Sequence, residues 1–132
     1  MLICKKKGKL NKIFKCGALA VMLGVASSAY AAGTSTAYIS VGSSSATGSN
    51  VTATGTSGTL TVTSSGPAFY VQGYAKVYKN WWPDTIKANL IANPGTSTST
   101  PFTATSGDQY YAQANTQANT TQISGSAKVT VN

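Results

Sequence analysis

The sequence predicts an all-β fold, a small antiparallel β-sandwich or open barrel of seven to eight short strands. Apolar and polar residues alternate with a period of two in several segments, which is the pattern of strands with one buried face. Turn-forming residues separate these segments, as at Asn93-Pro94-Gly95. The chain is also rich in Thr, which favours strands, and it contains no Arg or Glu, so helix-forming residues are scarce.

Residues 1–31 are predicted to be a secretory signal peptide that precedes this domain. An apolar run over residues 16–26 is shorter than the about 20 residues that span a bilayer. Ala29 and Ala31 supply the small side chains that a signal peptidase recognises, which places the cleavage after Ala31, with Ala29 or Ala32 as neighbouring alternatives. An uncleaved anchor helix is the competing interpretation. The basic segment before the apolar run contains Lys5, Lys6, Lys7, Lys9, Lys12 and Lys15.

Cleavage changes the charge and the chemistry of the chain. The whole sequence has a net charge of +8, but the mature part, residues 32–132, keeps four Lys and two Asp, a side-chain net of +2. Four dispersed lysines do not form the cluster that tracks nucleic-acid phosphates, so a nucleic-acid partner is not expected. Both cysteines, Cys4 and Cys16, leave with the signal peptide. We therefore expect a single secreted β-domain that folds without a disulfide and has no integral membrane span.

The clearest strand of this domain is predicted over residues 69–78. The interval 42–66 is rich in Ser, Thr and Gly, and it is either a flexible spacer or, as Val51, Leu60 and Val62 favour, a set of ordered, loosely packed strands. The residues that share one face of the 69–78 strand are Phe69, Val71, Gly73, Ala75 and Val77. The same alternation occurs in Ala37, Ile39 and Val41, and in Leu60 and Val62 among threonines. Further strands are predicted near 86–92, 101–105, 109–115 and 127–131.

The residue types of the mature domain argue against an enzyme. Without His or Cys it contains neither a Ser-His nor a Cys-His pair, and it lacks the usual zinc ligands. Asp84 and Asp108 are separated along the chain, and each lies in a predicted turn, where Asp commonly stabilises the backbone. We therefore expect no catalytic residues, no metal and no cofactor.

The aromatic residues are the candidate binding site. Three tyrosines fall on the second face of the 69–78 strand, interleaved with Gln72 and Lys76, and the strand continues into a Trp-Trp pair. Aromatic rings beside amide and ammonium donors stack on sugars or lie at a membrane surface. The alternative is structural, with the indoles capping the end of the sandwich and the tyrosines packed under a loop. The candidate residues are Tyr70, Tyr74, Lys76, Tyr78, Lys79, Trp81 and Trp82.

Over about residues 74–116 the order of these features resembles the lactococcin-type bacteriocins. The matching segments are Tyr78-Lys79-Asn80-Trp81-Trp82, the run 87–91, the turn Asn93-Pro94-Gly95, and Gly107 followed by Tyr110-Tyr111-Ala112-Gln113-Ala114. The resemblance implies a cysteine-free β-sandwich that is exported by a signal peptide and acts on a cell-wall precursor. The chain departs from that family in having no His, few charges, and the additional residues 32–73 before the match.

Two classes of function follow from the sequence. The first is a secreted, non-enzymatic protein that binds a bacterial cell-envelope component or glycan outside the cell, with a bacteriocin-like antimicrobial role. The second is an extracellular structural protein, such as a subunit of a biofilm matrix, adhesin or fibre, that self-associates through its strand edges. The exposure of the two indoles and the covering of the edge strands discriminate between them.

Overall fold

The computed structural model describes residues 32–117 and 120–132, and residues 32–132 form one compact unit. The predicted signal peptide and its cleavage residues, Ala29 and Ala31, lie outside the described residues. Among the described residues no helix is long and apolar enough to cross a membrane.

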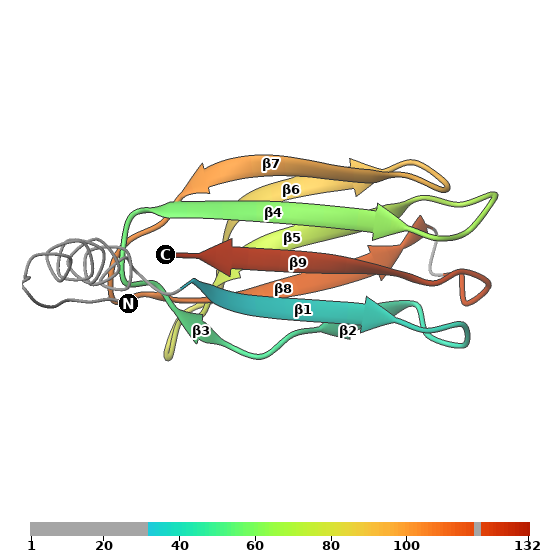
Figure 1. Ribbon diagram of the computed structural model, residues 1–132. Helices are drawn as coiled ribbons and strands as arrows, with labels where there is room; N and C mark the ends of the chain where they lie inside the picture. The colour runs from blue at the N-terminus through green and yellow to red at the C-terminus, as the bar shows by residue number, and fades with distance from the viewer. Residues whose placement is uncertain (1–31, 118–119) are drawn as a thin grey trace, which may run out of the picture. The chain divides into compact units, whose positions relative to one another are not determined.

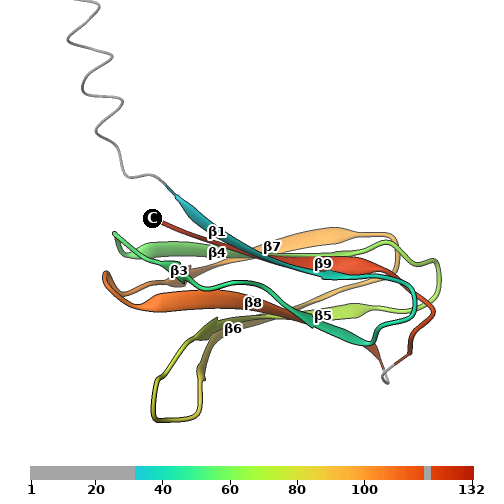
Figure 2. The same cartoon turned by 90° about the horizontal axis from the view of Figure 1, so that it is seen from below.

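Two antiparallel sheets pack face to face, as Figures 1 and 2 show. Sheet A has the order β1-β9-β4-β7, and sheet B has the order β2-β8-β5-β6, with the short β3 also paired to β8. The strands in the described residues are β1 (Gly33–Ile39), β2 (Ser45–Thr47), β3 (Val51–Thr52), β4 (Ser57–Ser64), β5 (Val71–Val77), β6 (Thr85–Ala92), β7 (Ser97–Thr103), β8 (Gln109–Thr116) and β9 (Gly125–Val131).

The predicted all-β sandwich is confirmed, and the two sheets do not close into a barrel. The described residues contain nine strands rather than seven to eight. The difference comes from the interval 42–66, which contributes β2 and β3, of three and two residues, in addition to β4. Strands this short carry too few alternating residues to be recognised from their sequence pattern.

Several predicted strand ends are wrong. The strand predicted near 101–105 is β7, which begins at Ser97 and ends at Thr103, and the strand predicted over 69–78 ends at Val77. Val41 does not continue the buried face of β1 but is 69% exposed, because the chain turns at Gly42, whose φ of 106° favours glycine. Phe69 lies before β5, where the Ser64 hydroxyl donates a hydrogen bond of 2.9 Å to its carbonyl oxygen. The Phe69 carbonyl thus bonds to a side chain, and the Phe69 ring still packs partly against the core.

The core between the sheets is built mainly from small side chains. Strand β5 alternates buried and half-buried residues throughout, and its buried face meets Leu60 and Val62 of β4 and Val129 of β9. Gly73 marks the closest approach, because a Cβ at this position would collide with Val62 and lie 3.0 Å from the Cβ of Ala127. The sheets are therefore held together by many small contacts over a thin core, and residues 32–132 contain no cysteine that could form a disulfide.

The 42–66 interval is fixed to sheet B by backbone contacts. Between β2 and β3, the N–H of Gly48 donates to the carbonyl oxygen of Ala112 at 2.8 Å. The N–H of Ala112 donates in turn to the hydroxyl of Ser35, a fully buried residue of β1, at 3.0 Å. A side chain at Gly48 would collide with this hydroxyl, so the small residues of the interval allow a close crossing between the two sheets.

Candidate functional site

The predicted binding residues of β5 lie on the outer face of sheet B. Tyr74 and Lys76 are half-buried and point away from the core, as the alternation predicts. Their register neighbours extend the surface across the sheet, since Tyr74 pairs with Gln113 and with Asn89. We call this surface the amide face, and it comprises Gln72, Tyr74, Lys76, Asn89, Tyr111, Gln113 and Asn115.

Lys76 lies along this face instead of extending into solvent. Its ammonium group donates a hydrogen bond of 2.8 Å to Oε1 of Gln113 on β8. Because the acceptor is an amide, the positive charge is not neutralised, and the half-buried stem covers part of the sheet. The amide face therefore carries a fixed cation among groups that both donate and accept hydrogen bonds.

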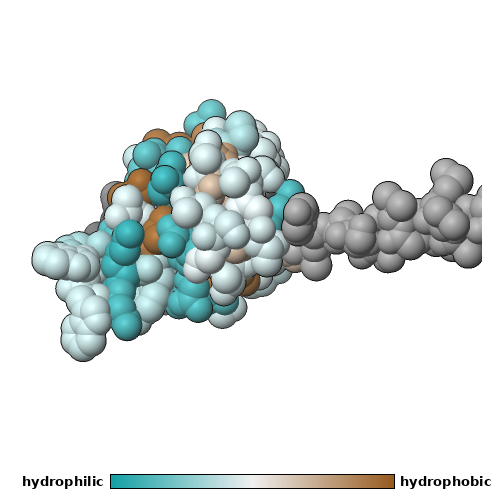
Figure 3. All heavy atoms as spheres, turned by 90° about the vertical axis from the view of Figure 1, so that its left-hand side faces the viewer, coloured by the Kyte–Doolittle hydropathy of each residue, from teal (hydrophilic) through white to brown (hydrophobic). Residues whose placement is uncertain are grey.

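The other predicted residues lie in the loop that joins β5 to β6, residues 78–84, which we call the indole loop. The loop projects from one end of the sandwich (Figures 1 and 2). Trp81 is 87% exposed and Trp82 is 76% exposed, so neither indole caps the core. Figure 3 faces this end of the molecule, and a group of pale, weakly polar side chains projects there beyond the rounded body, with strongly hydrophilic ones beside it.

Asp84 anchors the indole loop at both of its ends. Its Oδ1 accepts the backbone N–H of Lys79 at 2.8 Å, which closes the loop on itself. Its Oδ2 accepts the hydroxyl of Tyr111 at 2.5 Å, which ties the loop to β8 across the intervening β5. A third contact lies within the loop, where the Tyr78 hydroxyl donates to Oδ1 of Asn80 at 3.1 Å.

The anchor changes the titration of both of its partners. The hydrogen bonds from the Tyr111 hydroxyl and from the backbone of Lys79 hold the pKa of Asp84 below its usual 3.8. Burial, and then the hydrogen bond to Asp84 and its negative charge, raise the pKa of Tyr111 to about 12. Asp84 is thus ionised and Tyr111 is neutral over the physiological pH range, which is the pairing that the hydrogen bond requires.

Sequence reasoning missed Tyr111 and its hydrogen bond to Asp84, whereas the bond from the Lys79 backbone to Asp84 agrees with the predicted turn. Tyr110 and Tyr111 are adjacent in β8, so they must point to opposite faces of the sheet. Tyr110 is fully buried, with its ring 5.7 Å from that of Phe102, and this places Tyr111 on the outer face beside Lys76. The alternation in β8 was a usable signal for Tyr111, but the contact with Asp84 depends on the order of the strands.

Tyr70 is the predicted residue that the structure separates from the others. It precedes β5, whereas the indole loop follows β5, so the length of the strand lies between them. Its backbone N–H donates to Oε1 of Gln117 at 3.3 Å. The remaining six predicted residues occupy one continuous stretch of the β5–β6 hairpin.

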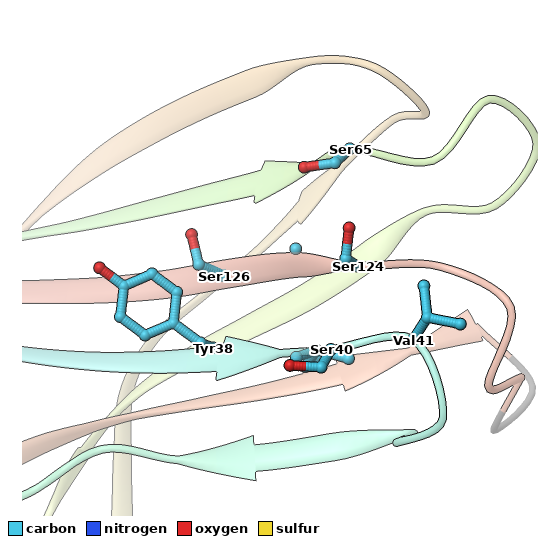
Figure 4. A pocket seen from close by; sticks show the side chains of 8 residues that line it. Tyr38, Ser40, Val41, Ser65, Ser124 and Ser126 are labelled. Atoms are coloured by element: carbon cyan, nitrogen blue, oxygen red, sulfur yellow. The ribbon is translucent and has the colours of Figure 1, made fainter.

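A hollow of about 560 Å³ lies at the opposite end of the sandwich from the indole loop. Figure 4 shows its lining, which is formed by Tyr38, Ser40, Val41, Ser65, Ser124 and Ser126 together with the backbone near Ile39 and Gly125. The lining side chains are hydroxyl or apolar groups without charge, which do not supply an acid, a base or a metal ligand. Among the described residues no group of three or more His, Cys, Asp or Glu is placed to hold a metal ion.

A comparison with models of known protein families found no match, and a comparison with curated proteins found no similar sequence. The resemblance to lactococcin-type bacteriocins therefore stays a prediction.

Proposed function

We propose that the protein is a secreted, non-enzymatic binding protein that acts outside the cell on a bacterial envelope, in a bacteriocin-like antimicrobial role. The observation that carries this proposal is the indole loop, which keeps two large aromatic side chains in solvent on an anchored scaffold. Exposed aromatic residues on a fixed loop are characteristic of recognition surfaces, since their burial on binding contributes much of the affinity.

The amide face extends this surface with polar groups of fixed position. Gln113 is half-buried and oriented by Lys76, so its remaining lone pair and its N–H groups are available in a defined geometry. Tyr111 is only 9% exposed, and it supports this surface through its hydrogen bond to Asp84. Such a face supports binding to an envelope component or a glycan, because both present hydroxyl, amide and phosphate groups.

The chemistry of Asp84 supports a binding role rather than a catalytic one. Both of its oxygens accept hydrogen bonds that hold the loop, and its lowered pKa removes it from service as a general acid near neutral pH. The one further acid of the mature domain is Asp108, which lies in the turn before β8.

The strand edges are poorly suited to the structural alternative. In sheet A, the edge strand β7 contains Pro101, which has no N–H to donate to an added strand. The other edge strand, β1, is covered by the β2–β3 segment, where Val51 lies against Gly33. In sheet B, the pairing of β6 with β5 is interrupted by a bulge at Lys87, and bulges and lysines discourage edge-to-edge addition. These features favour a discrete binding protein over a self-assembling fibre subunit.

The proposal is tested with the mature chain that begins at Ala32. We expect it to inhibit growth of related bacteria and to remain a discrete particle in size analysis and electron microscopy. The Trp81→Ala and Trp82→Ala variants should lose this inhibition while staying folded, because both side chains are exposed. Tyr38→Ala is the matched control, since Tyr38 is 74% exposed but lies at the opposite end of the sandwich. Ordered filaments without any effect on growth would favour the structural alternative.

A further inference from the structure

The indole loop is a convex projection, and this shape limits the kind of partner that it fits. Small-molecule and sugar sites are usually concave and bury most of the ligand. With 87% and 76% of their surfaces exposed, Trp81 and Trp82 have few protein neighbours that would form the walls of such a site. The hollow lined by Tyr38 and Val41 lies at the other end of the sandwich. The loop therefore fits a partner with an extended or deformable surface, which the two indoles can enter, better than a small ligand.

The charge around the loop is positive. Three of the four lysines of the mature domain, Lys76, Lys79 and Lys87, belong to the β5–β6 hairpin, and the one acid there is Asp84. Both oxygens of Asp84 are engaged in the anchor. Lys79 lies in the loop before the two indoles, Lys87 lies in β6 shortly after the loop, and both are exposed. The loop thus presents indoles at its tip with ammonium groups beside them.

Resting on the proposed function, we infer that the envelope component is the surface of a phospholipid bilayer that contains anionic lipids. Indole rings favour the headgroup level of a bilayer, where the ring is partly desolvated and the N–H stays hydrated. Lysines that flank an inserted tip keep their ammonium groups at the anionic headgroups while their stems follow the apolar part. Trp81 and Trp82 insert at this level, and Lys79 and Lys87 contact the lipid phosphates.

The anchor of the loop makes this insertion more favourable. A loop that is already ordered loses less conformational entropy on binding than one that folds at the surface. The contacts of Asp84 with Lys79 and Tyr111 provide this order before any lipid is met. Tyr78, the first residue of the loop, is 42% exposed, and Ile86, in the adjoining β6, is 49% exposed, so both enlarge the apolar area that reaches the interface.

The test uses the mature chain and vesicles of phosphatidylcholine with or without phosphatidylglycerol. The sequence contains two Trp, and both lie in the loop, so the intrinsic fluorescence reports on the loop alone. We expect a blue shift and quenching by lipids brominated near the headgroup with the anionic vesicles. Trp81→Phe and Trp82→Phe each leave a single reporter, which shows whether both indoles insert.

Cosedimentation with the same vesicles measures the contribution of each group. The double variant Trp81→Ala, Trp82→Ala should bind at least about tenfold more weakly, since it removes two large apolar surfaces. Lys79→Gln and Lys87→Gln should each weaken binding to anionic vesicles by about fivefold. Binding should also fall as salt is raised. Tyr38→Ala should bind as the parent chain does.

The inference is overturned if the chain neither sediments with anionic vesicles nor shows quenching by brominated lipid. Parallel sedimentation with purified peptidoglycan sacculi then separates this failure from that of the proposed function. Binding to sacculi that needs Trp81 and Trp82 would make a glycan the partner and leave the envelope-binding role in place. Binding to neither vesicles nor sacculi, together with normal growth of exposed bacteria, would remove both proposals.

Discussion

The outer faces of the two sheets differ in chemistry although they rest on the same core. On sheet A, which we call the hydroxyl face here, short Thr and Ser side chains bond to one another across β4 and β7, with Thr61 2.8 Å from Ser99 and Thr63 2.9 Å from Ser97 between hydroxyl oxygens. On sheet B, the amide face carries longer side chains and leads into the indole loop. The hydroxyl groups of sheet A hydrogen-bond to one another. In the indole loop, by contrast, the side chains of Trp81 and Trp82 are largely exposed to solvent.

The burial pattern does not explain this difference. Strands β4 and β5 both bury every second residue, so folding constrains the inner residues of the two sheets in the same way. It constrains the outer residues much less. The outer residues are therefore free to be selected for something other than folding. This is why we assign the binding role to sheet B and the indole loop, and the variants below either separate the two faces or affect both together.

The largest effect is expected for Gly73→Val, which should damage both faces equally. Its side chain would collide with Val62 of sheet A, and overpacking in a thin core should cost about 3 kcal/mol of unfolding free energy. Urea unfolding followed by circular dichroism measures this, because two exposed indoles report unfolding weakly. Thr63→Val, a substitution on the outer face of β4, is the control and should change stability by less than about 0.5 kcal/mol.

Ser35→Ala should have the next largest effect and should act mainly on sheet B, although Ser35 belongs to sheet A. The variant removes the hydroxyl that accepts the N–H of Ala112 in β8. A buried donor left without an acceptor costs about 1–3 kcal/mol. Urea unfolding and amide hydrogen exchange at Ala112 measure the change. Exchange at Ala112 that matches the parent chain, with unchanged stability, would contradict this role of the hydroxyl.

The strands of both sheets could be predicted to a large extent, because a period of two is a local property of the sequence. The face formed by Val71, Ala75 and Val77 in β5 follows from alternation alone. The anchor of the indole loop could not be predicted, since Tyr111 meets Asp84 only because β8 and β6 flank β5. The exposure of the indoles likewise depends on where the hairpin ends relative to the rest of the sandwich, which no local pattern determines.

A smaller effect, confined to the indole loop, is expected from pH. Because the folded-state pKa of Asp84 is lowered, the anchor is complete above the usual 3.8 and is lost as the pH falls through the lowered value. Because the pKa of Tyr111 is raised to about 12, the stability that its hydroxyl contributes is complete below its usual 10.0. That stability is lost as the pH rises toward and through about 12.

Nuclear magnetic resonance of the Trp81 and Trp82 side chains and of the Asp84 carboxyl carbon measures this titration. The loop resonances should shift at both pH extremes, while those of Thr61 on the hydroxyl face stay constant. Tyr111→Phe removes the largest contribution to the shift, so the pKa of Asp84 should move back toward 3.8. An Asp84 pKa that is the same in Tyr111→Phe and in the parent chain would show that the hydroxyl does not hold the loop in solution.

The smallest effect is expected for Thr61→Ala on the hydroxyl face. The variant removes the hydrogen bond to Ser99, but both groups are at the surface, so water replaces the lost partner and the change in stability should be below about 0.5 kcal/mol. Growth inhibition and vesicle binding should match the parent chain, measured beside Trp81→Ala. If Thr61→Ala instead abolished activity while the fold stayed intact, the binding surface would lie on sheet A. The Thr and Ser hydroxyls that bond to one another across β4 and β7 would then have to bond to a ligand instead. The binding role would have to be assigned to the hydroxyl face and not to the indole loop.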